Sequence, residues 1–301
     1  MRGMRAAAFL VFLGSAAAHA QDLEPRLYTN VPRGLNFLVA GYAYSEGNVL
    51  FDPSVPLEDG NVRIHSPVFG YARSLDLWGM SGKFDVISAY GCASGSALFQ
   101  GEYRERDICG AADPRFRVSV NLYGAPSLTL EEFTRYRQDL IVGASLQVSA
   151  PLGQYDGERL LNIGTNRWFF KPEIGLGKAW GPVTLELNAA AFFYTRNSDY
   201  LGGNTKDQEP IYSLQGHIIY AFRSGIWFAL DGTFYRGGQT TVDGVKGDDL
   251  QENSRIGATL ALPVNRHHSV KILASTGMSA RTGSDYDTIG LFWQYRWGAG
   301  L

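Results

Sequence analysis

The stretch that decides the fold class is Arg115-Phe116-Arg117-Val118-Ser119-Val120-Asn121-Leu122. Apolar side chains occupy every second position, and arginine, serine and asparagine alternate with them. A β-strand directs successive side chains to opposite faces, whereas a helix would scatter these charges around its circumference. The stretch therefore predicts a strand with one apolar face and one charged or polar face.

The same alternation recurs along the chain and predicts an all-β protein. Strand lengths near ten residues and an even strand count are typical of a single antiparallel outer-membrane β-barrel. We expect twelve strands, near residues 34–45, 66–77, 83–91, 114–123, 138–150, 168–179, 183–194, 210–222, 226–237, 252–263, 268–279 and 285–297.

The connections between these strands alternate in length, as in outer-membrane barrels with short periplasmic turns and longer outer loops. The outer set is long and polar except for 280–284, and it comprises 46–65, 92–113, 151–167, 195–209 and 238–251. The inner set is mostly tight. One inner connection, 124–137, contains Thr129-Leu130-Glu131-Glu132, a capping-box pattern that predicts a short periplasmic helix.

A soluble β-sandwich or a lipocalin-like barrel would also alternate, and it is the main alternative fold. Aromatic residues near strand ends favour the membrane barrel, because such barrels carry aromatic girdles at both interfaces. These aromatic residues are Trp168, Trp180, Phe193, Tyr194, Tyr220, Phe222, Trp227, Phe234, Tyr235, Trp293 and Trp297.

The first twenty residues follow the order of a secretory signal peptide, with Arg2 and Arg5, an apolar run and then Ala18-His19-Ala20. An N-terminal membrane helix is the alternative, but the apolar run is shorter than the ~20 residues of a span. We therefore expect a cleaved signal at 1–20, a periplasmic segment at 21–33 and the barrel at 34–301. The segment 21–33 is expected either to plug the barrel mouth or to be a flexible tail.

The sequence resembles the outer-membrane proteins assigned to the MetA pathway of phenol degradation, over most of the chain after the signal. The matching stretches are Leu23-Glu24-Pro25-Arg26, Asn36-Phe37, Asp113-Pro114, Asn121-Leu122, Pro151-Leu152-Gly153-Gln154-Tyr155-Asp156, Asn162-Ile163-Gly164-Thr165-Asn166-Arg167-Trp168 and Lys171-Pro172-Glu173. The resemblance implies a transporter-like barrel without an assigned catalytic centre. It is a weak guide to the substrate, because the family name reflects association with aromatic catabolism.

Charged residues fall on the face of the strands opposite to the apolar one, and a charge facing lipid would cost about 2 to 4 kcal/mol near the midplane. We expect these charges to line the lumen, at Arg115, Arg117, Lys171, Glu173, Glu186, Asp231, Arg255, Lys271 and Arg296. They would either select solutes along an aqueous path or fill a narrow bore with a side-chain network. Lys171, Glu173 and Glu186 are expected to pair across neighbouring strands.

The two cysteines, Cys92 and Cys109, fall in one expected outer loop of an exported chain. We expect a disulfide between them, because the periplasm is oxidising; two unpaired thiols are the alternative. The net charge of −2 gives no indication of nucleic-acid binding. No metal site or cofactor is expected; Asp243, Asp248 and Asp249 would at most hold calcium weakly.

These patterns lead to three functional hypotheses. The first is a passive outer-membrane channel for small solutes, with aromatic or hydrophobic ones as candidates. The second is a structural or adhesive barrel with a closed lumen. The third and least favoured is an outer-membrane hydrolase, because His217 has only Ser213 and Gln215 beside it on its strand, so no enzymatic activity is expected. The expected partners are outer-membrane lipid, lipopolysaccharide, a small-molecule solute and, during biogenesis, the barrel assembly machinery.

Overall fold

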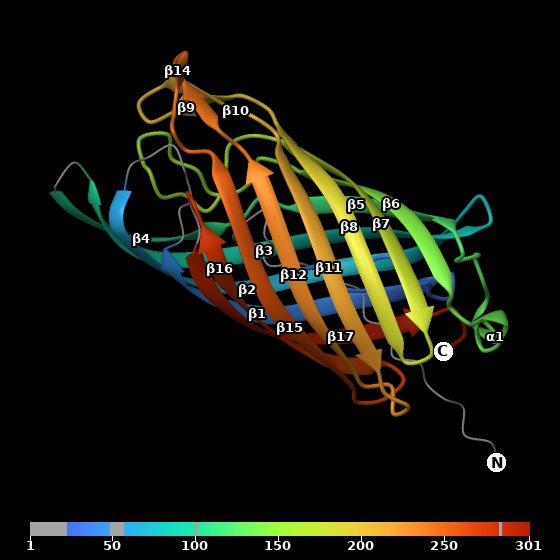
Figure 1. The fold of residues 1–301 in the computed structure, drawn as a ribbon. Helices are drawn as coiled ribbons and strands as arrows, with labels where there is room; N and C mark the ends of the chain where they lie inside the picture. The colour runs from blue at the N-terminus through green and yellow to red at the C-terminus, as the bar shows by residue number, and fades with distance from the viewer. Residues whose placement is uncertain (1–22, 49–56, 100–101, 283–284) are drawn as a thin grey trace.

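The computed structural model describes residues 23–48, 57–99, 102–282 and 285–301 (Figure 1). Twelve antiparallel strands form a closed barrel, in which β1 pairs with both β2 and β17. The barrel strands are β1 (Leu35–Asn48), β2 (Leu57–Leu77), β3 (Met80–Phe99), β5 (Arg115–Tyr123), β6 (Leu140–Ser149), β7 (Phe169–Trp180), β8 (Val183–Tyr194), β11 (Ile211–Ala221), β12 (Trp227–Gly237), β15 (Gln251–Pro263), β16 (His268–Ala280) and β17 (Asp285–Gly298).

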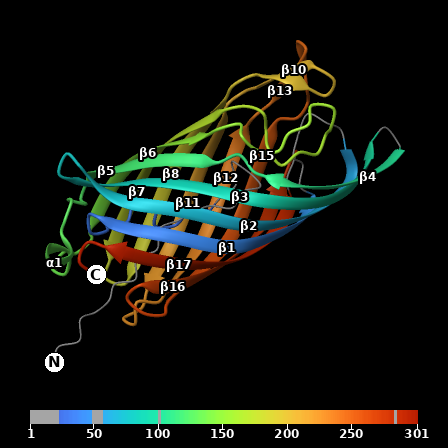
Figure 2. The same ribbon diagram turned by 180° about the vertical axis from the view of Figure 1, so that it is seen from behind.

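The twelve expected strands and the all-β barrel are confirmed, but the outer connections hold more structure than expected. The range 92–113 is a hairpin rather than a loop, because β3 continues to Phe99 and pairs with β4 (Glu102–Ala111). A small second sheet is built from β9 (Asn197–Tyr200), β10 (Asn204–Gln208), β13 (Thr240–Val242) and β14 (Val245–Lys246). These elements gather at one end of the barrel, as Figures 1 and 2 show.

The opposite end carries tight turns and the helix α1 (Leu130–Phe133). Its capping box is present: the Thr129 side chain accepts a hydrogen bond from the Glu132 backbone, and the Glu132 carboxylate accepts one from the Thr129 backbone. The expected short helix is therefore confirmed, at the end of the barrel opposite the β3–β4 hairpin. Within the described part of the chain, no helix is long and apolar enough to cross a membrane. The expected signal peptide lies outside the described residues.

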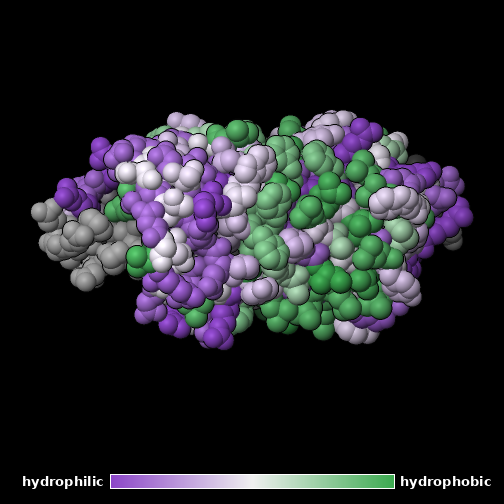
Figure 3. All heavy atoms as spheres, turned by 90° about the horizontal axis from the view of Figure 1, so that it is seen from above, coloured by the Kyte–Doolittle hydropathy of each residue, from purple (hydrophilic) through white to green (hydrophobic). Residues whose placement is uncertain are grey.

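The barrel wall is apolar outside, and its buried charged side chains face inward, which inverts the usual distribution of a soluble protein. On β5 the Arg117 side chain is 2% exposed, whereas its neighbour Val118 is 48% exposed. Apolar side chains form a belt across the face shown in Figure 3, and hydrophilic side chains lie toward both ends. This partition is that of a barrel whose outer wall faces lipid, and the chain is an outer-membrane β-barrel.

Three residues expected in the outer aromatic girdle face the barrel interior instead: Trp227 and Tyr235 on β12, and Tyr194 on β8, which packs against the buried cluster of Phe169 and Phe192. Trp227 and Tyr235 on β12 are both 0% exposed. The odd-numbered residues of β12 face the lumen, and Asp231 between these two aromatic residues does the same. Position near a strand end is therefore not enough to assign an aromatic residue to a girdle, because the parity along the strand decides the face.

Candidate functional site: a plugged lumen

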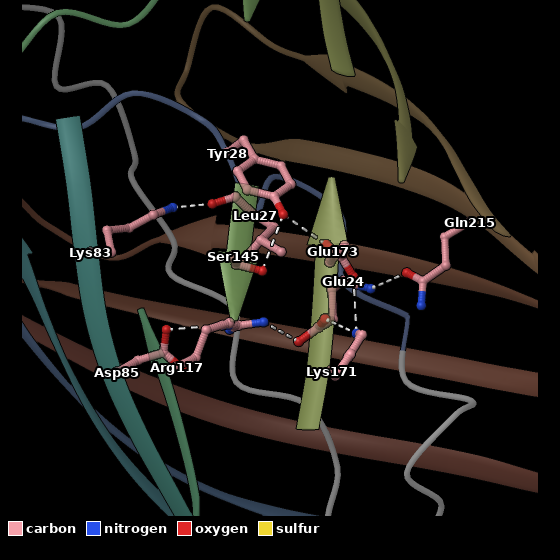
Figure 4. A network of polar contacts seen from close by, with 10 residues as sticks. All are labelled: Glu24, Leu27, Tyr28, Lys83, Asp85, Arg117, Ser145, Lys171, Glu173 and Gln215. Carbon is pink, nitrogen blue, oxygen red and sulfur yellow. Dashed lines mark hydrogen bonds and ion pairs between the residues drawn. The ribbon is translucent and has the colours of Figure 1, made fainter. Parts of the chain in front are cut away.

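The segment 23–33 lies within the barrel and contacts several strands of its wall. Figure 4 shows Glu24, Leu27 and Tyr28 of this segment bonded to side chains from different strands. Near the periplasmic end, Ser74 Oγ donates to the Pro32 carbonyl at 2.6 Å, and Arg33 forms an ion pair with Asp76 at 3.2 Å. The segment therefore rises from the periplasmic rim into the lumen. We call residues 23–33 the lumen segment.

Glu24 joins the lumen segment to two strands by buried ion pairs. Its Oε1 lies 2.6 Å from Arg117 Nη1 on β5, and its Oε2 lies 3.0 Å from Lys171 Nζ on β7. Each cation has a second carboxylate, since Arg117 Nε lies 3.0 Å from Asp85 Oδ2 and Lys171 Nζ lies 3.0 Å from Glu173 Oε2. The result is an alternating network of charges across the lumen.

The electrostatics of Glu24 follow from this network. Burial alone would raise the pKa of the Glu24 carboxyl, but attraction by Arg117 and Lys171 and the hydrogen bonds they donate hold it well below its ordinary value. The carboxylate is therefore ionised in the folded protein. A buried pair of this kind is costly to break from one side, because the remaining charge stays buried without its counter-ion.

Tyr28 fixes the lumen segment against β6 and β7. Its hydroxyl donates to Glu173 Oε1 at 3.1 Å and lies 3.2 Å from Ser145 Oγ. The ring covers Gly143 and Gly175, which face each other in the β6–β7 register. A Cβ atom at either glycine would lie 2.1 Å from a ring carbon of Tyr28, so only glycine leaves room for the ring at both positions.

Further contacts hold the backbone of the lumen segment. The Arg26 N–H donates to Glu186 Oε2 on β8 at 2.6 Å, and the Arg26 guanidinium lies 5.1 Å from the Trp227 ring. Lys83 on β3 donates through Nζ to the Leu27 carbonyl. Strands on opposite sides of the barrel thus hold the same short segment.

The structure places all nine expected lumen-lining residues at buried positions of the wall. Arg117, Lys171, Glu173 and Glu186 contact the lumen segment or its ion-pair partners, whereas Arg296 donates through Nε to the Arg266 carbonyl at 2.6 Å. The buried residues are Arg115, Arg117, Lys171, Glu173, Glu186, Asp231, Arg255, Lys271 and Arg296.

The expected pairing among Lys171, Glu173 and Glu186 occurs only in part. Lys171 and Glu173 form an ion pair along one face of β7. Glu186 stands opposite Gly177 on β7 and His217 on β11, and it accepts from Arg26 instead. The four residues along β7 from Glu173 to Gly177 separate Glu186 from the Lys171 pair.

His217 makes a contact that was not predicted from the sequence. Its Nδ1 lies 2.8 Å from Asp231 Oδ1 on β12, and Thr259 on β15 donates to the other oxygen of that carboxylate at 3.0 Å. The β11–β12 register places His217 directly opposite Asp231. Alignment of the two predicted strands would have revealed this pair, because Asp231 was expected to face the lumen and His217 lies directly opposite it.

Lys83 and Asp85 also belong to the network but were not among the expected lumen residues. Both are buried on β3, and Asp85 pairs with Arg117 in the β3–β5 register. The signal was present in the sequence, because Lys83 and Asp85 alternate with Phe84 and Val86. Glu24 could not be assigned in this way, since its segment has no strand periodicity.

One side of the lumen is apolar. Val39 and Ala43 of β1, Val68 of β2, Ala89 of β3 and Phe292 of β17 form a buried cluster. A second cluster toward the outer end contains Val62, Ile64, Ala93 and Tyr286, with Ile108, Leu161 and Ile163 packed against it. The interior therefore combines an apolar wall with a charged wall.

The outer loop 151–167 is tied down over this apolar wall. Asp113 accepts hydrogen bonds from the Gly153 and Thr165 backbone N–H groups, each at 2.8 Å, and from the Thr165 hydroxyl at 2.7 Å. Ile163 of the same loop packs against both apolar clusters. The loop therefore covers part of the apolar wall near the outer end.

Cys92 and Cys109 form a disulfide across the β3–β4 hairpin, where they face each other in the register. In the part of the chain that the structure describes, no three His, Cys, Asp or Glu residues are grouped to hold a metal ion. Asp243 accepts from the Thr205 backbone, Asp249 accepts from Thr240, and Asp248 pairs with Arg281. These three carboxylates serve separate contacts rather than one calcium site.

Comparison with known proteins supports the same architecture. A family model described as "Putative MetA-pathway of phenol degradation" matches residues 62–291. Among solved structures, an outer membrane channel from Pseudomonas putida F1 is 18% identical, with a TM-score of 0.75, and the match covers 91% of this chain and 99% of that one. The β domain of the Bordetella autotransporter BrkA is 11% identical, with a TM-score of 0.51 and coverage of 88% and 100%. No curated protein sequence matches.

Proposed function

Because this chain belongs to the MetA-pathway of phenol degradation family, we propose that it is a passive outer-membrane channel for small solutes that is closed by its own lumen segment. The barrel is channel-like in architecture. The observation that carries the proposal is the burial of Glu24 between Arg117 and Lys171. A charge-paired segment that fills the bore can be released without unfolding the wall, because the ladder of the barrel strands does not include it.

The two walls of the lumen suggest which solutes pass. The apolar wall around Val68 and Phe292 favours molecules with an aromatic or aliphatic body, because the removal of apolar surface from water lowers the free energy. The charged wall keeps the opposite side of the path hydrated. Small aromatic or hydrophobic solutes that carry a polar group fit both surfaces. Passage is diffusive, with selectivity set by lumen width and charge.

The test is electrical conductance of the purified protein in planar lipid bilayers. Glu24→Gln keeps the shape of the side chain but removes the charge that holds Arg117 and Lys171, so we expect open events to become about tenfold more frequent, or more. Glu131→Gln, on the exposed periplasmic helix, is the matched control and should behave like the wild type. Heat-modifiable electrophoretic mobility verifies that each variant forms the barrel.

A structural barrel with a closed lumen is the second candidate, and the number of contacts made by the lumen segment favours it. The same experiment separates the two. If Glu24→Gln is folded but conducts no more current than the wild type, the channel proposal fails and the closed barrel is supported.

A further inference from the structure

Arg255 is a buried cation without an acidic partner among the described residues. It lies on β15 and is 2% exposed. Its Nη2 donates to Ser275 Oγ on β16 at 3.0 Å, and its Nη1 is buried without a hydrogen-bond partner. Buried guanidinium groups are normally paired with carboxylates, because an uncompensated charge inside a protein is costly. Arg117, in the same lumen, shows the usual arrangement with two carboxylates.

Aromatic packing holds Arg255 in place without using its hydrogen-bond donors. The guanidinium carbon lies 3.9 Å from the centroid of the Tyr286 ring on β17. Such stacking supports the charge through the face of the ring and leaves the donors in the guanidinium plane available. An oriented guanidinium with available donors is suited to binding a carboxylate.

The surroundings of Tyr286 indicate the chemical character of the rest of a ligand whose carboxylate binds Arg255. Tyr286 belongs to the outer apolar cluster with Val62, Ile64 and Ala93, against which Leu161 and Ile163 pack. The cation therefore stands at the border of an apolar surface. A ligand with an apolar body and one anionic end would satisfy both parts.

We propose that Arg255, stacked on Tyr286 at the border of the outer apolar cluster, is a docking site for small organic anions in which a carboxylate is attached to an apolar body. The site deepens the proposed function, on which it rests for access of the solute to the lumen. It names the class of solute as amphiphilic carboxylates, of which aromatic monocarboxylates are the simplest.

The experiment is isothermal titration of the full, detergent-solubilised barrel with benzoate as the probe. Benzyl alcohol, which has the ring without the charge, and acetate, which has the charge without the ring, are the comparison ligands. We expect saturable benzoate binding. The affinity of each comparison ligand should be lower than that of benzoate by about tenfold or more, because each ligand lacks one of the two contacts.

Three variants assign the binding to Arg255. Arg255→Gln should weaken benzoate binding about tenfold or more, and Arg255→Lys should have an intermediate effect because it keeps the charge and loses the planar fork. Arg236→Gln, an exposed arginine on β12, is the matched control and should leave the affinity unchanged. Heat-modifiable mobility confirms folding, and the intermediate affinity of Arg255→Lys distinguishes recognition from general damage.

Two results would overturn the proposal. One is the absence of saturable benzoate binding both in the wild type and in Glu24→Gln, in which the lumen segment is released. The other is equal benzoate affinity in the wild type and folded Arg255→Gln. Conductance separates this inference from the proposed function. Benzoate binding without conductance would support the Arg255 site and contradict the channel. Conductance together with benzoate binding that does not depend on Arg255 would support the channel and contradict the Arg255 site.

Discussion

The ring of Tyr28 occupies the space that a side chain at Gly175 would need, since a Cβ there would lie 2.1 Å from Tyr28 Cε2. We predict that Gly175→Ala displaces the ring and loosens the lumen segment, with a penalty typical of overpacking, about 1 to 3 kcal/mol. Increased hydrogen exchange of the segment backbone would report this change. Gly216→Ala is the control, because a Cβ at Gly216 meets no atom within 4 Å. Equal exchange in both variants would contradict the role of Tyr28.

Acid should also release the lumen segment. The pKa of Glu24 lies below its ordinary value of 4.5, despite burial, because of Arg117 and Lys171. Ionised Glu24 therefore stabilises docking at every pH above about 4.5, and this contribution is lost progressively as the pH falls toward the lowered pKa. Conductance should therefore rise as the pH falls below about 4.5, on the order of tenfold or more once Glu24 is protonated.

The acid response of Glu24→Gln provides the control for that prediction. Glu173, Glu186, Asp85 and Asp231 are further buried carboxylates of the lumen, so the wild-type response must be compared with that of the variant. The Glu24 contribution is the part that disappears in the variant. An acid response of the same size in both proteins would show that Glu24 does not hold the segment.

Asp113 should control the outer loop independently of the lumen segment. Asp113→Ala removes the acceptor of three hydrogen bonds from Gly153 and Thr165. Together these bonds stabilise the loop by on the order of 3 kcal/mol. We predict faster protease cleavage within 151–167, while the barrel keeps its heat-modifiable mobility. Asp139→Ala, which loses only the exposed periplasmic pair to Lys178, should leave that cleavage rate unchanged. A loop that stays protected in Asp113→Ala would refute the anchoring role.

The disulfide should stabilise the outer hairpin rather than the barrel. Replacing Cys92 and Cys109 by serine removes a cross-link between residues 17 apart in the sequence. This cross-link stabilises the hairpin by on the order of 3 kcal/mol, because it restricts the unfolded chain. We expect proteolysis to begin within β3–β4 while the remainder of the barrel persists. Loss of barrel folding in the serine variant would contradict this local role.

The strands could be predicted from the sequence because lipid and lumen impose opposite demands on alternate residues. Phe116 and Arg117 already show that partition, and their burial follows it. The extension of β3 was missed because Gly91, Ser94 and Gly95 carry no apolar alternation. The second sheet was missed for a similar reason, since Asn197–Tyr200 and Asn204–Gln208 are polar on both faces.

The site was only half predictable, for a physical reason. Parity along a strand places Lys171 or Arg255 in the lumen, but it does not say which partner each will meet. Partners depend on strand register and on the path of the lumen segment. Glu24 lies 93 residues from Arg117 in the sequence and meets it only after the barrel has closed. Several stretches that carry the family resemblance meet here: Glu24 and Arg26 in the segment, and Lys171 and Glu173 in the wall.

The most direct test of the proposed channel is the bilayer conductance of a chain that lacks residues 23–30 and keeps 31–33, so that the contacts of Pro32 and Arg33 with β2 at the periplasmic rim are retained. We predict a folded barrel with sustained open current and faster benzoate flux than the wild type. A folded barrel that remains closed to both ions and benzoate would contradict the proposed channel.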